Sequence, residues 1–179
     1  MLRYYVLKKS WTRKLTAMAS NAYEYLPSAR NFSASEWFEP EILKLVSARV
    51  LQELDHLRDR CGFALHPSQL SDGWARTTGS TTSRHYAGDG LSIAGDFFPA
   101  GDVLECWIKA VEMPHWGGFG VYLDTNLNEK QPRAMMHLDL RTGPRVFWVR
   151  NANGNYVYKH DDPDRFWKTL FRARQRVWA

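Results

Sequence analysis

The strongest structural signal in this sequence is a run of apolar residues between Pro40 and Arg60. They recur at the three- and four-residue spacings of a single helix face. They are Ile42, Leu43, Leu45, Val46, Val50, Leu51, Leu54 and Leu57. Pro40 suits the first turn of a helix, and Gly62 suits the position just after its end. The pattern therefore predicts one helix from Pro40 to about Arg60.

The pattern changes after this helix. Residues 63–67 predict a short strand, and residues 68–92 are rich in Ser, Thr, Gly and Asp with little periodicity. The second segment is therefore expected to be a long loop, and long loops inside compact domains usually serve function.

The second half of the chain predicts mainly strands. Because helical patterns come first and antiparallel strands follow, the predicted class is α+β, with a small antiparallel sheet packed against helices. The expected strands are residues 118–123, 134–140, 146–150 and 156–159, and the expected helices are residues 102–112 and 163–176, with Asp102 and Asp162 as N-caps.

The net charge of the 179-residue chain is +5, but it is unevenly placed. Residues 1–30 hold six Lys or Arg and one acid, and residues 165–179 hold five Lys or Arg and no acid. Each end contributes +5, which leaves −5 on residues 31–164. This distribution does not match the single basic face of a sequence-specific nucleic-acid-binding protein. We expect a basic aromatic arm (1–30), a domain (31–160) and a basic C-terminal helix (161–179), with the two ends contacting an acidic partner.

Three further features bound the protein class. No stretch reaches the ~18 apolar residues of a membrane helix, so no membrane span is expected. The first fifteen residues lack an apolar core and a small-residue cleavage site, so no signal peptide is expected. The two cysteines, Cys61 and Cys106, are too few for a disulfide scaffold and are expected as small core residues.

The residues that could carry chemistry are two histidines and two aspartates. His85 lies in the long loop, Asp96 follows it, and His137 and Asp139 lie in a predicted strand. Residues two apart in a strand share a face, so His137 and Asp139 point the same way, and Met136 points into the core. Two His and one Asp, with a fourth position left to water, make up a catalytic zinc site. The pattern alone also fits an ordinary loop histidine and a strand histidine hydrogen-bonded to Asp139.

Several segments match a known family in order. Residues 31–38 (NFSASEWF) look like its opening turn, 51–62 (LQELDHLRDRCG) like its first core helix, 71–77 (SDGWART) like its Ser-Gly-Tyr-Arg segment, and 83–88 (SRHYAG) like the start of its Ser-x-His-x-x-Gly zinc motif. Residues 118–122 (GFGVY), 136–139 (MHLD) and 147–148 look like its closing strands, which carry a His-x-Asp. Over about two thirds of the chain, this series resembles the zinc D-alanyl-D-alanine peptidases, which act on peptidoglycan and share the hedgehog/DD-peptidase fold.

The resemblance implies His85, Asp96 and His137 as zinc ligands. Arg76 takes the place of the arginine that steadies the substrate and the oxyanion, a role that suits a permanently charged guanidinium. The family places its Asp ligand seven residues after the first His, where this chain has Ser92. The Ala-x-Asp ending reappears four residues later, so Asp96 is taken as the ligand after an enlarged loop. Asp89 is the lesser candidate.

A second departure concerns the proton-transfer residue. Many members carry Glu three residues before the last His, where this chain has Ala134. Asp139 is therefore the candidate second catalytic residue beside Arg76. It could hold the tautomer of a histidine ligand from behind, or act on the water itself.

Two functions follow from the resemblance. The first is a zinc peptidase that cuts D-amino-acid-containing peptides of bacterial peptidoglycan, encoded by a phage and found in the host cytoplasm or the virion. The second is a non-catalytic structural protein of a phage particle that reuses the fold, with its basic ends contacting other virion subunits. The intact Arg76, His85 and His137 favour the first function, whereas the shifted Asp96, the missing Glu at position 134 and the charged ends favour the second.

Overall fold

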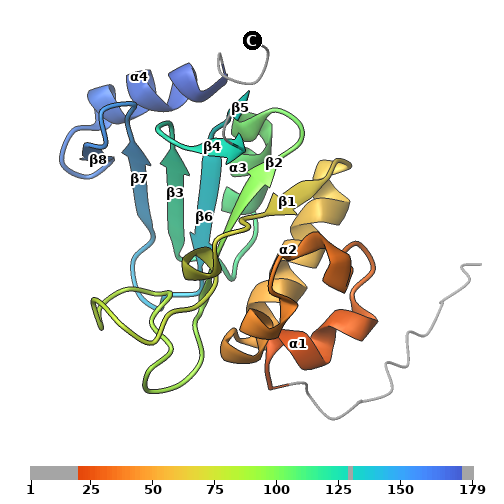
Figure 1. Cartoon of the computed structure of the whole chain (residues 1–179). Helices are drawn as coiled ribbons and strands as arrows, with labels where there is room; N and C mark the ends of the chain where they lie inside the picture. The colour runs from red at the N-terminus through yellow and green to blue at the C-terminus, as the bar shows by residue number, and fades with distance from the viewer. Residues whose placement is uncertain (1–19, 129–130, 175–179) are drawn as a thin grey trace, which may run out of the picture.

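The computed structural model describes residues 20–128 and 131–174 (Figure 1). The α-helices are α1 (Ala22–Tyr25), α2 (Ala48–Cys61), α3 (Val103–Val111) and α4 (Pro163–Ala173), and the 3-10 helices are η1 (Leu26–Ser28), η2 (Ala34–Glu36), η3 (Pro40–Leu45) and η4 (Ser71–Gly73). The strands are β1 (Leu65–Pro67), β2 (Ala94–Pro99), β3 (Gly118–Tyr122), β4 (Asn126–Asn128), β5 (Gln131–Pro132), β6 (Met135–Asp139), β7 (Val146–Arg150) and β8 (Tyr156–Tyr158).

The α+β class is confirmed, but the main sheet is mixed rather than antiparallel. Six strands run in the order β1-β2-β6-β3-β7-β8, while β4 and β5 form a separate two-stranded sheet. All neighbours in the main sheet are antiparallel except β3 and β7. β6 and β7 follow one another along the chain and lie on opposite sides of β3. They run in opposite directions, so β7, unlike β6, is parallel to β3. Figure 1 shows these strands side by side, with α4 at the β7–β8 end.

One face of the sheet forms the core with the later helices. Trp107 of α3 packs against Phe119 of β3, Phe147 of β7 and Phe166 of α4, at ring-centroid separations of 5.8–6.5 Å. Met136 on β6 is fully buried, as the alternation of its strand predicted. The residues between these positions therefore project from the other face, which carries His137 and Asp139.

The predicted helix from Pro40 to Arg60 is wrong as a single element. The chain forms η3, then turns extended at Val46, and starts α2 only at Ala48. The break has a physical cause: the N–H of Ser47 donates to the carbonyl of Ser92 (2.9 Å), and the N–H of Ser92 donates to the carbonyl of Leu45 (2.8 Å). These bonds to the end of the long loop replace helical ones. The predicted cap is confirmed, since Gly62 is left-handed with φ 71°.

The N-terminal part that the structure describes packs on α2. Ala22 and Leu26 are buried in the core. The carboxylate of Asp55, itself buried, accepts hydrogen bonds from the backbone N–H groups of Arg30 and Asn31 at 3.0 and 2.9 Å. The C-terminal end of the predicted arm therefore joins the domain, while its residues 1–19 lie outside the described residues.

The C-terminal helix packs on its own sheet. Asp162 caps it as predicted, by accepting from the N–H of Arg165 (2.9 Å). Phe166 and Leu170 are buried, and Arg174 pairs with Asp102 at the start of α3 (2.8 Å). The residues beyond Arg174 lie outside the described part.

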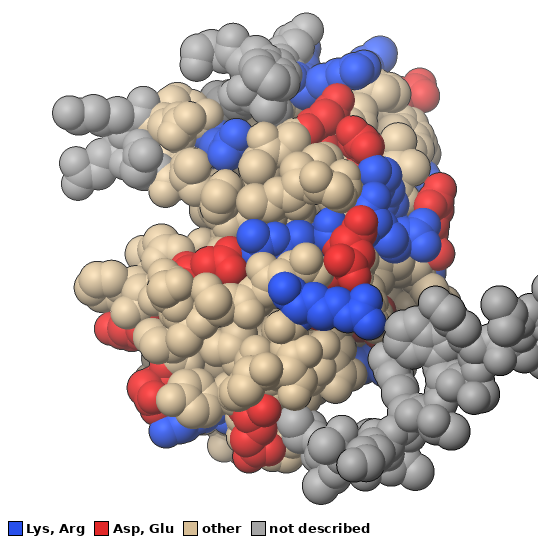
Figure 2. Space-filling model, turned by 90° about the vertical axis from the view of Figure 1, so that its right-hand side faces the viewer, with Lys and Arg blue, Asp and Glu red and all other residues tan. Residues whose placement is uncertain are grey.

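Charges of both signs are interspersed on the face that Figure 2 shows. Arg58 pairs with Glu36 (2.7 Å) and Arg60 with Glu112 (2.5 Å). Cys61 and Cys106 are both buried and free, as expected. In the described part of the chain, no helix is both long and apolar enough to cross a membrane.

Candidate metal centre

Strand pairing brings Asp96 and His137 together. β2 and β6 are antiparallel neighbours in which Asp96 lies directly opposite His137 and Ala94 opposite Asp139. Directly opposed residues on neighbouring strands point to the same face, about 5 Å apart. The Ala-x-Asp segment therefore supplies Asp96 to the face that carries the histidine.

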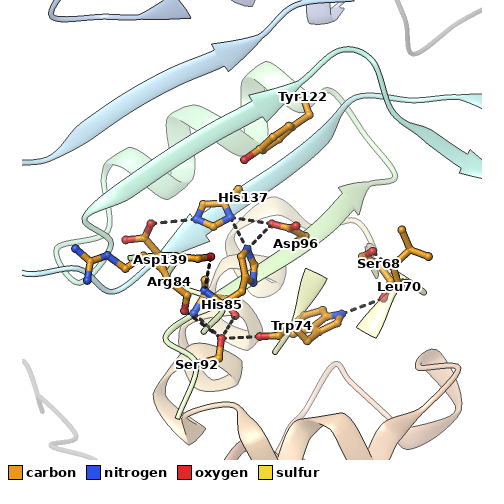
Figure 3. Close-up of polar contacts among 12 residues, drawn as sticks. Ser68, Leu70, Trp74, Arg84, His85, Ser92, Asp96, Tyr122, His137 and Asp139 are labelled. Atoms are coloured by element: carbon orange, nitrogen blue, oxygen red, sulfur yellow. Dashed lines mark hydrogen bonds and ion pairs between the residues drawn. The ribbon is translucent and has the colours of Figure 1, made fainter. Parts of the chain in front are cut away.

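The long loop brings His85 to the same place. Arg76 and Ala87 fasten the loop across itself: the N–H of Arg76 donates to the carbonyl of His85 (2.9 Å), and the N–H of Ala87 donates to the carbonyl of Arg76 (2.8 Å). The fully buried hydroxyl of Ser92 donates to the carbonyl of Trp74 at 2.5 Å (Figure 3). The loop is therefore held at both ends of the segment that contains His85.

Three donor atoms converge at one point. Nδ1 of His137 lies 3.0 Å from Nε2 of His85 and 2.9 Å from Oδ1 of Asp96, and the last two atoms are 3.4 Å apart. Four ligands at ~2.0–2.1 Å around a tetrahedral zinc are separated by about 3.3 Å. The three atoms therefore have nearly the separation that a shared metal ion would give them, and they form a group that could hold one.

The second ring nitrogen of His137 is bound by Asp139. Its Nε2 lies 3.0 Å from Oδ2 of Asp139, and the guanidinium of Arg141 donates to both oxygens of that carboxylate, at 2.8 and 2.6 Å. The backbone N–H of Arg141 adds a third bond. A carboxylate only accepts, so Nε2 donates its proton to Asp139, and Nδ1 is the ring nitrogen that could bind a metal once it loses its own proton.

This donor set suits a cation. Nδ1 of His137 faces a carboxylate oxygen and a second imidazole nitrogen, so these atoms attract a positive charge, which either a proton on Nδ1 or a shared metal ion supplies. Burial alone would lower the pKa of His137, but its hydrogen bonds to Asp139 and Asp96 outweigh burial and raise the pKa to about 9. Burial would raise the pKa of Asp96, but the two histidines lower it well below its ordinary value. The pocket thus favours positive charge, and a divalent metal satisfies it with oxygen and nitrogen ligands that zinc accepts.

The open side of the group lies near Asp96. Its side chain is 14% exposed, whereas that of Asp139 is fully buried. Solvent therefore reaches the group at Asp96 and, to a lesser extent, at His85, whose side chain is 10% exposed, and not at Asp139.

Two glycines of β3 make room on this face. A Cβ on Gly118 would lie 2.1 Å from Oδ2 of Asp139, and a Cβ on Gly120 would lie 2.6 Å from Nε1 of Trp148. The indole of Trp148 therefore lies over the bare backbone of β3, and its ring packs against His137 at a centroid separation of 5.2 Å. The Gly-x-Gly alternation of residues 118–120 is the sequence signal that could have predicted this arrangement.

The other residues considered from the sequence, Asp89, Ser92 and Arg76, lie outside the converging group. Asp89 is exposed in a turn and does not join the group, and Ser92, at the family's Asp position, is buried with its hydroxyl bound to backbone carbonyls. The guanidinium of Arg76 donates to the hydroxyl of Ser83 at 2.5 Å, and its Nε is buried without a partner among the described residues. Arg141, which the sequence analysis missed, is the residue that holds Asp139.

Comparisons with known proteins assign no function to this site. No family model, curated protein or solved structure matches the chain. What the chain does show is an α+β fold with a mixed six-stranded sheet and a buried His-Asp-His group that could bind a metal ion.

Proposed function

We propose that the protein is a zinc-dependent peptidase that acts on the peptides of bacterial peptidoglycan. The observation that carries the proposal is the convergence of His85 Nε2, Asp96 Oδ1 and His137 Nδ1 at separations of 2.9–3.4 Å, with a side open beside Asp96. Zinc held there would polarise a carbonyl oxygen and acidify a coordinated water.

Each residue of the site has a distinct task in this proposal. His85, Asp96 and His137 bind the metal, and Asp139 with Arg141 keeps the His137 ring in the tautomer that presents Nδ1. Asp139 is proposed to position His137 and not to act on the water, because its carboxylate contacts Nε2 of His137 and is fully buried. Because the Asp139 carboxylate is buried, it cannot contact a substrate.

Arg76 is proposed to bind the substrate oxygen. Its backbone is paired with that of His85, and its side chain is only partly buried. A guanidinium keeps its charge at all relevant pH values and offers several N–H donors, of which one binds the hydroxyl of Ser83. A charged donor of this kind stabilises a carbonyl oxygen as negative charge develops on it.

The substrate class rests on the resemblance of the ordered segments to the zinc D-alanyl-D-alanine peptidases. The residues that the resemblance selected, His85, Asp96 and His137, are the ones that lie together in space. The three residues come from a loop and two strands, and their meeting in space supports the resemblance and, with it, a D-amino-acid peptide as the substrate. The hedgehog/DD-peptidase fold is part of the same proposal.

One observation favours the alternative, a non-catalytic phage virion protein with a structural metal. Ala134, at the position where the family carries Glu, is buried and apolar. A site with ligands but without a dedicated proton acceptor at that position would bind zinc and not turn over.

The experiment that tests the proposal measures metal first and hydrolysis second. We expect one zinc ion per chain in the purified protein, lost in His85→Ala and in Asp96→Asn and retained in the control Asp89→Asn, which changes an exposed turn. The zinc-loaded protein should release peptide products from purified peptidoglycan, detected by mass spectrometry. A metal-free wild type would overturn the zinc peptidase, and zinc without product release would favour the structural alternative.

A further inference from the structure

Tyr122 is directed at the open part of the candidate metal centre. It is the last residue of β3 and shares a face with Gly120, which lies opposite His137 in the neighbouring strand. Figure 3 shows its ring above the site with the hydroxyl end turned toward His137. Because Gly118 and Gly120 carry no side chain, Tyr122 is the only residue of β3 that reaches over this face.

The phenol ring is held in one place by its neighbours. The guanidinium of Arg150 lies over it, 4.5 Å from the ring centroid, and is itself fixed by Asp124 (2.8 Å). The ring of Tyr156 meets it edge-on at 6.2 Å. Groups that are already fixed before a ligand arrives lose little entropy when they bind it.

The hydroxyl of Tyr122 accepts one hydrogen bond and can still donate one. Its oxygen accepts a hydrogen bond from Nε1 of Trp148 (3.3 Å), so the indole fixes the direction of the oxygen's lone pair. Its own proton meets no acceptor among the residues that the structure describes. Burial, and next the charge of Asp96, raise the pKa of Tyr122 well above its ordinary value, so the phenol keeps this proton.

We propose that the hydroxyl of Tyr122 donates a hydrogen bond to an oxygen of the ligand held at the open side of His85, Asp96 and His137, which makes Tyr122 a second oxyanion-binding residue beside Arg76. The inference rests on the proposed metal site. A neutral donor fixed in this way stabilises negative charge on a ligand oxygen and needs no rearrangement during the reaction. Trp148 is then a positioning residue, because it acts on the ligand only through the phenol.

The test uses acetohydroxamate, a small oxyanion, as the probe and the cobalt(II)-loaded protein as the receptor, because cobalt in a zinc site has a visible spectrum that changes when a ligand binds. Tyr122→Phe removes only the hydroxyl and is expected to weaken acetohydroxamate binding about tenfold or more, as expected for a hydrogen bond to a charged group. The cobalt content should stay at the wild-type value. The control Tyr158→Phe removes a hydroxyl from an exposed tyrosine of β8 and should change the binding less than twofold.

A second variant tests the route through the indole. Trp148→Phe leaves the phenol in place but removes its N–H donor, and should weaken acetohydroxamate binding by a smaller factor than Tyr122→Phe. Binding within twofold of wild type in Tyr122→Phe, or a cobalt-loaded wild type that binds no acetohydroxamate, would overturn the inference and leave the metal site standing. A wild type that binds no cobalt or zinc would overturn the metal site and the inference together.

Discussion

Nε2 of His137 lies 3.0 Å from a carboxylate oxygen of Asp139, a residue two positions away on the same strand face. The opposite nitrogen of the same ring lies 2.9 Å from Asp96 on the neighbouring strand. One imidazole is thus fixed between two carboxylates, one fully buried and the other at the open side. This asymmetry distinguishes the residue that would bind the metal from the residue that would orient its ligand.

Asp139→Asn is expected to weaken zinc binding without abolishing it. The amide oxygen can still accept from Nε2, but the substitution removes the negative charge that supports the ligand and that Arg141 neutralises. Loss of an outer partner of a metal-bound histidine usually costs ~10–100-fold in affinity. Competition with a chelator of known affinity measures the change.

The matched control for that measurement is Asp161→Asn, because Asp161 pairs with His160 on the surface, where both side chains are about two-thirds exposed. It should leave zinc affinity unchanged. Equal zinc affinity in Asp139→Asn and wild type would contradict the positioning role of Asp139.

Zinc should stabilise the wild-type fold and not the ligand variants. A ligand that binds only the folded state at 100 times its Kd stabilises it by about 2.7 kcal/mol. For a chain of this length, each kcal/mol raises Tm by ~2–4 °C, so the expected rise is about 5–10 °C. Calorimetry with zinc and with a chelator checks it. The same rise in His85→Ala would mean that zinc binds elsewhere.

Local periodicity was enough to predict one strand of the site and not its neighbour. The alternation in residues 136–139 placed His137 and Asp139 on one face because side-chain direction in a strand depends only on position. It could not show that β2 pairs with β6, since strand order and register depend on contacts between distant segments. Asp96 was selected by resemblance to the Ala-x-Asp motif, and its position opposite His137 agrees with that choice.

Other features depend on contacts that local sequence does not encode. The break before α2 results from backbone bonds between Ser47 and Ser92, which are 45 positions apart, although the helical periodicity continues across it. Arg141 follows β6 in a segment without regular structure, and only the folded chain shows that its guanidinium turns back onto Asp139. Propensity and periodicity describe neighbours along the chain, and these two contacts are tertiary.

Ser92→Asp should not create a substitute for the Asp96 ligand. The hydroxyl of Ser92 is fully buried and donates to backbone carbonyls, so a carboxylate there would face acceptors and lose its hydration. We expect the double variant Ser92→Asp/Asp96→Asn to bind no zinc and to be less stable than Asp96→Asn in urea. Restored zinc binding in the double variant would show that position 92 can supply the ligand.

Ser92→Ala separates the structural role of this residue from metal binding. Removing the hydroxyl leaves the carbonyl of Trp74 without this donor, which should cost ~1–3 kcal/mol of unfolding free energy. Zinc affinity in the folded protein should change little, because Ser92 is not one of the converging residues. Ser80→Ala, at an exposed hydroxyl, is the control and should be neutral. Urea titration measures the first effect and chelator competition the second.

Gly120→Ala should displace the indole of Trp148. A methyl group at this position would lie 2.5 Å from the ring, closer than real side-chain contacts allow, and β3 is paired on both sides and cannot move away. Overpacking of this kind costs typically ~1–3 kcal/mol of unfolding free energy. Urea titration measures the loss, and near-ultraviolet circular dichroism reports the changed environment of the tryptophan.

Gly90→Ala is the matched control for Gly120→Ala, because a Cβ there meets nothing within 4 Å. It should leave both stability and the tryptophan signal close to wild type. The hydrogen bond from Trp148 to Tyr122 requires the indole to lie on the bare backbone of Gly120. Gly120→Ala should therefore also weaken acetohydroxamate binding to the cobalt-loaded protein, in the same direction as Trp148→Phe. A Gly120→Ala protein with wild-type stability and wild-type acetohydroxamate binding would show that the indole can leave this position without consequence for the site.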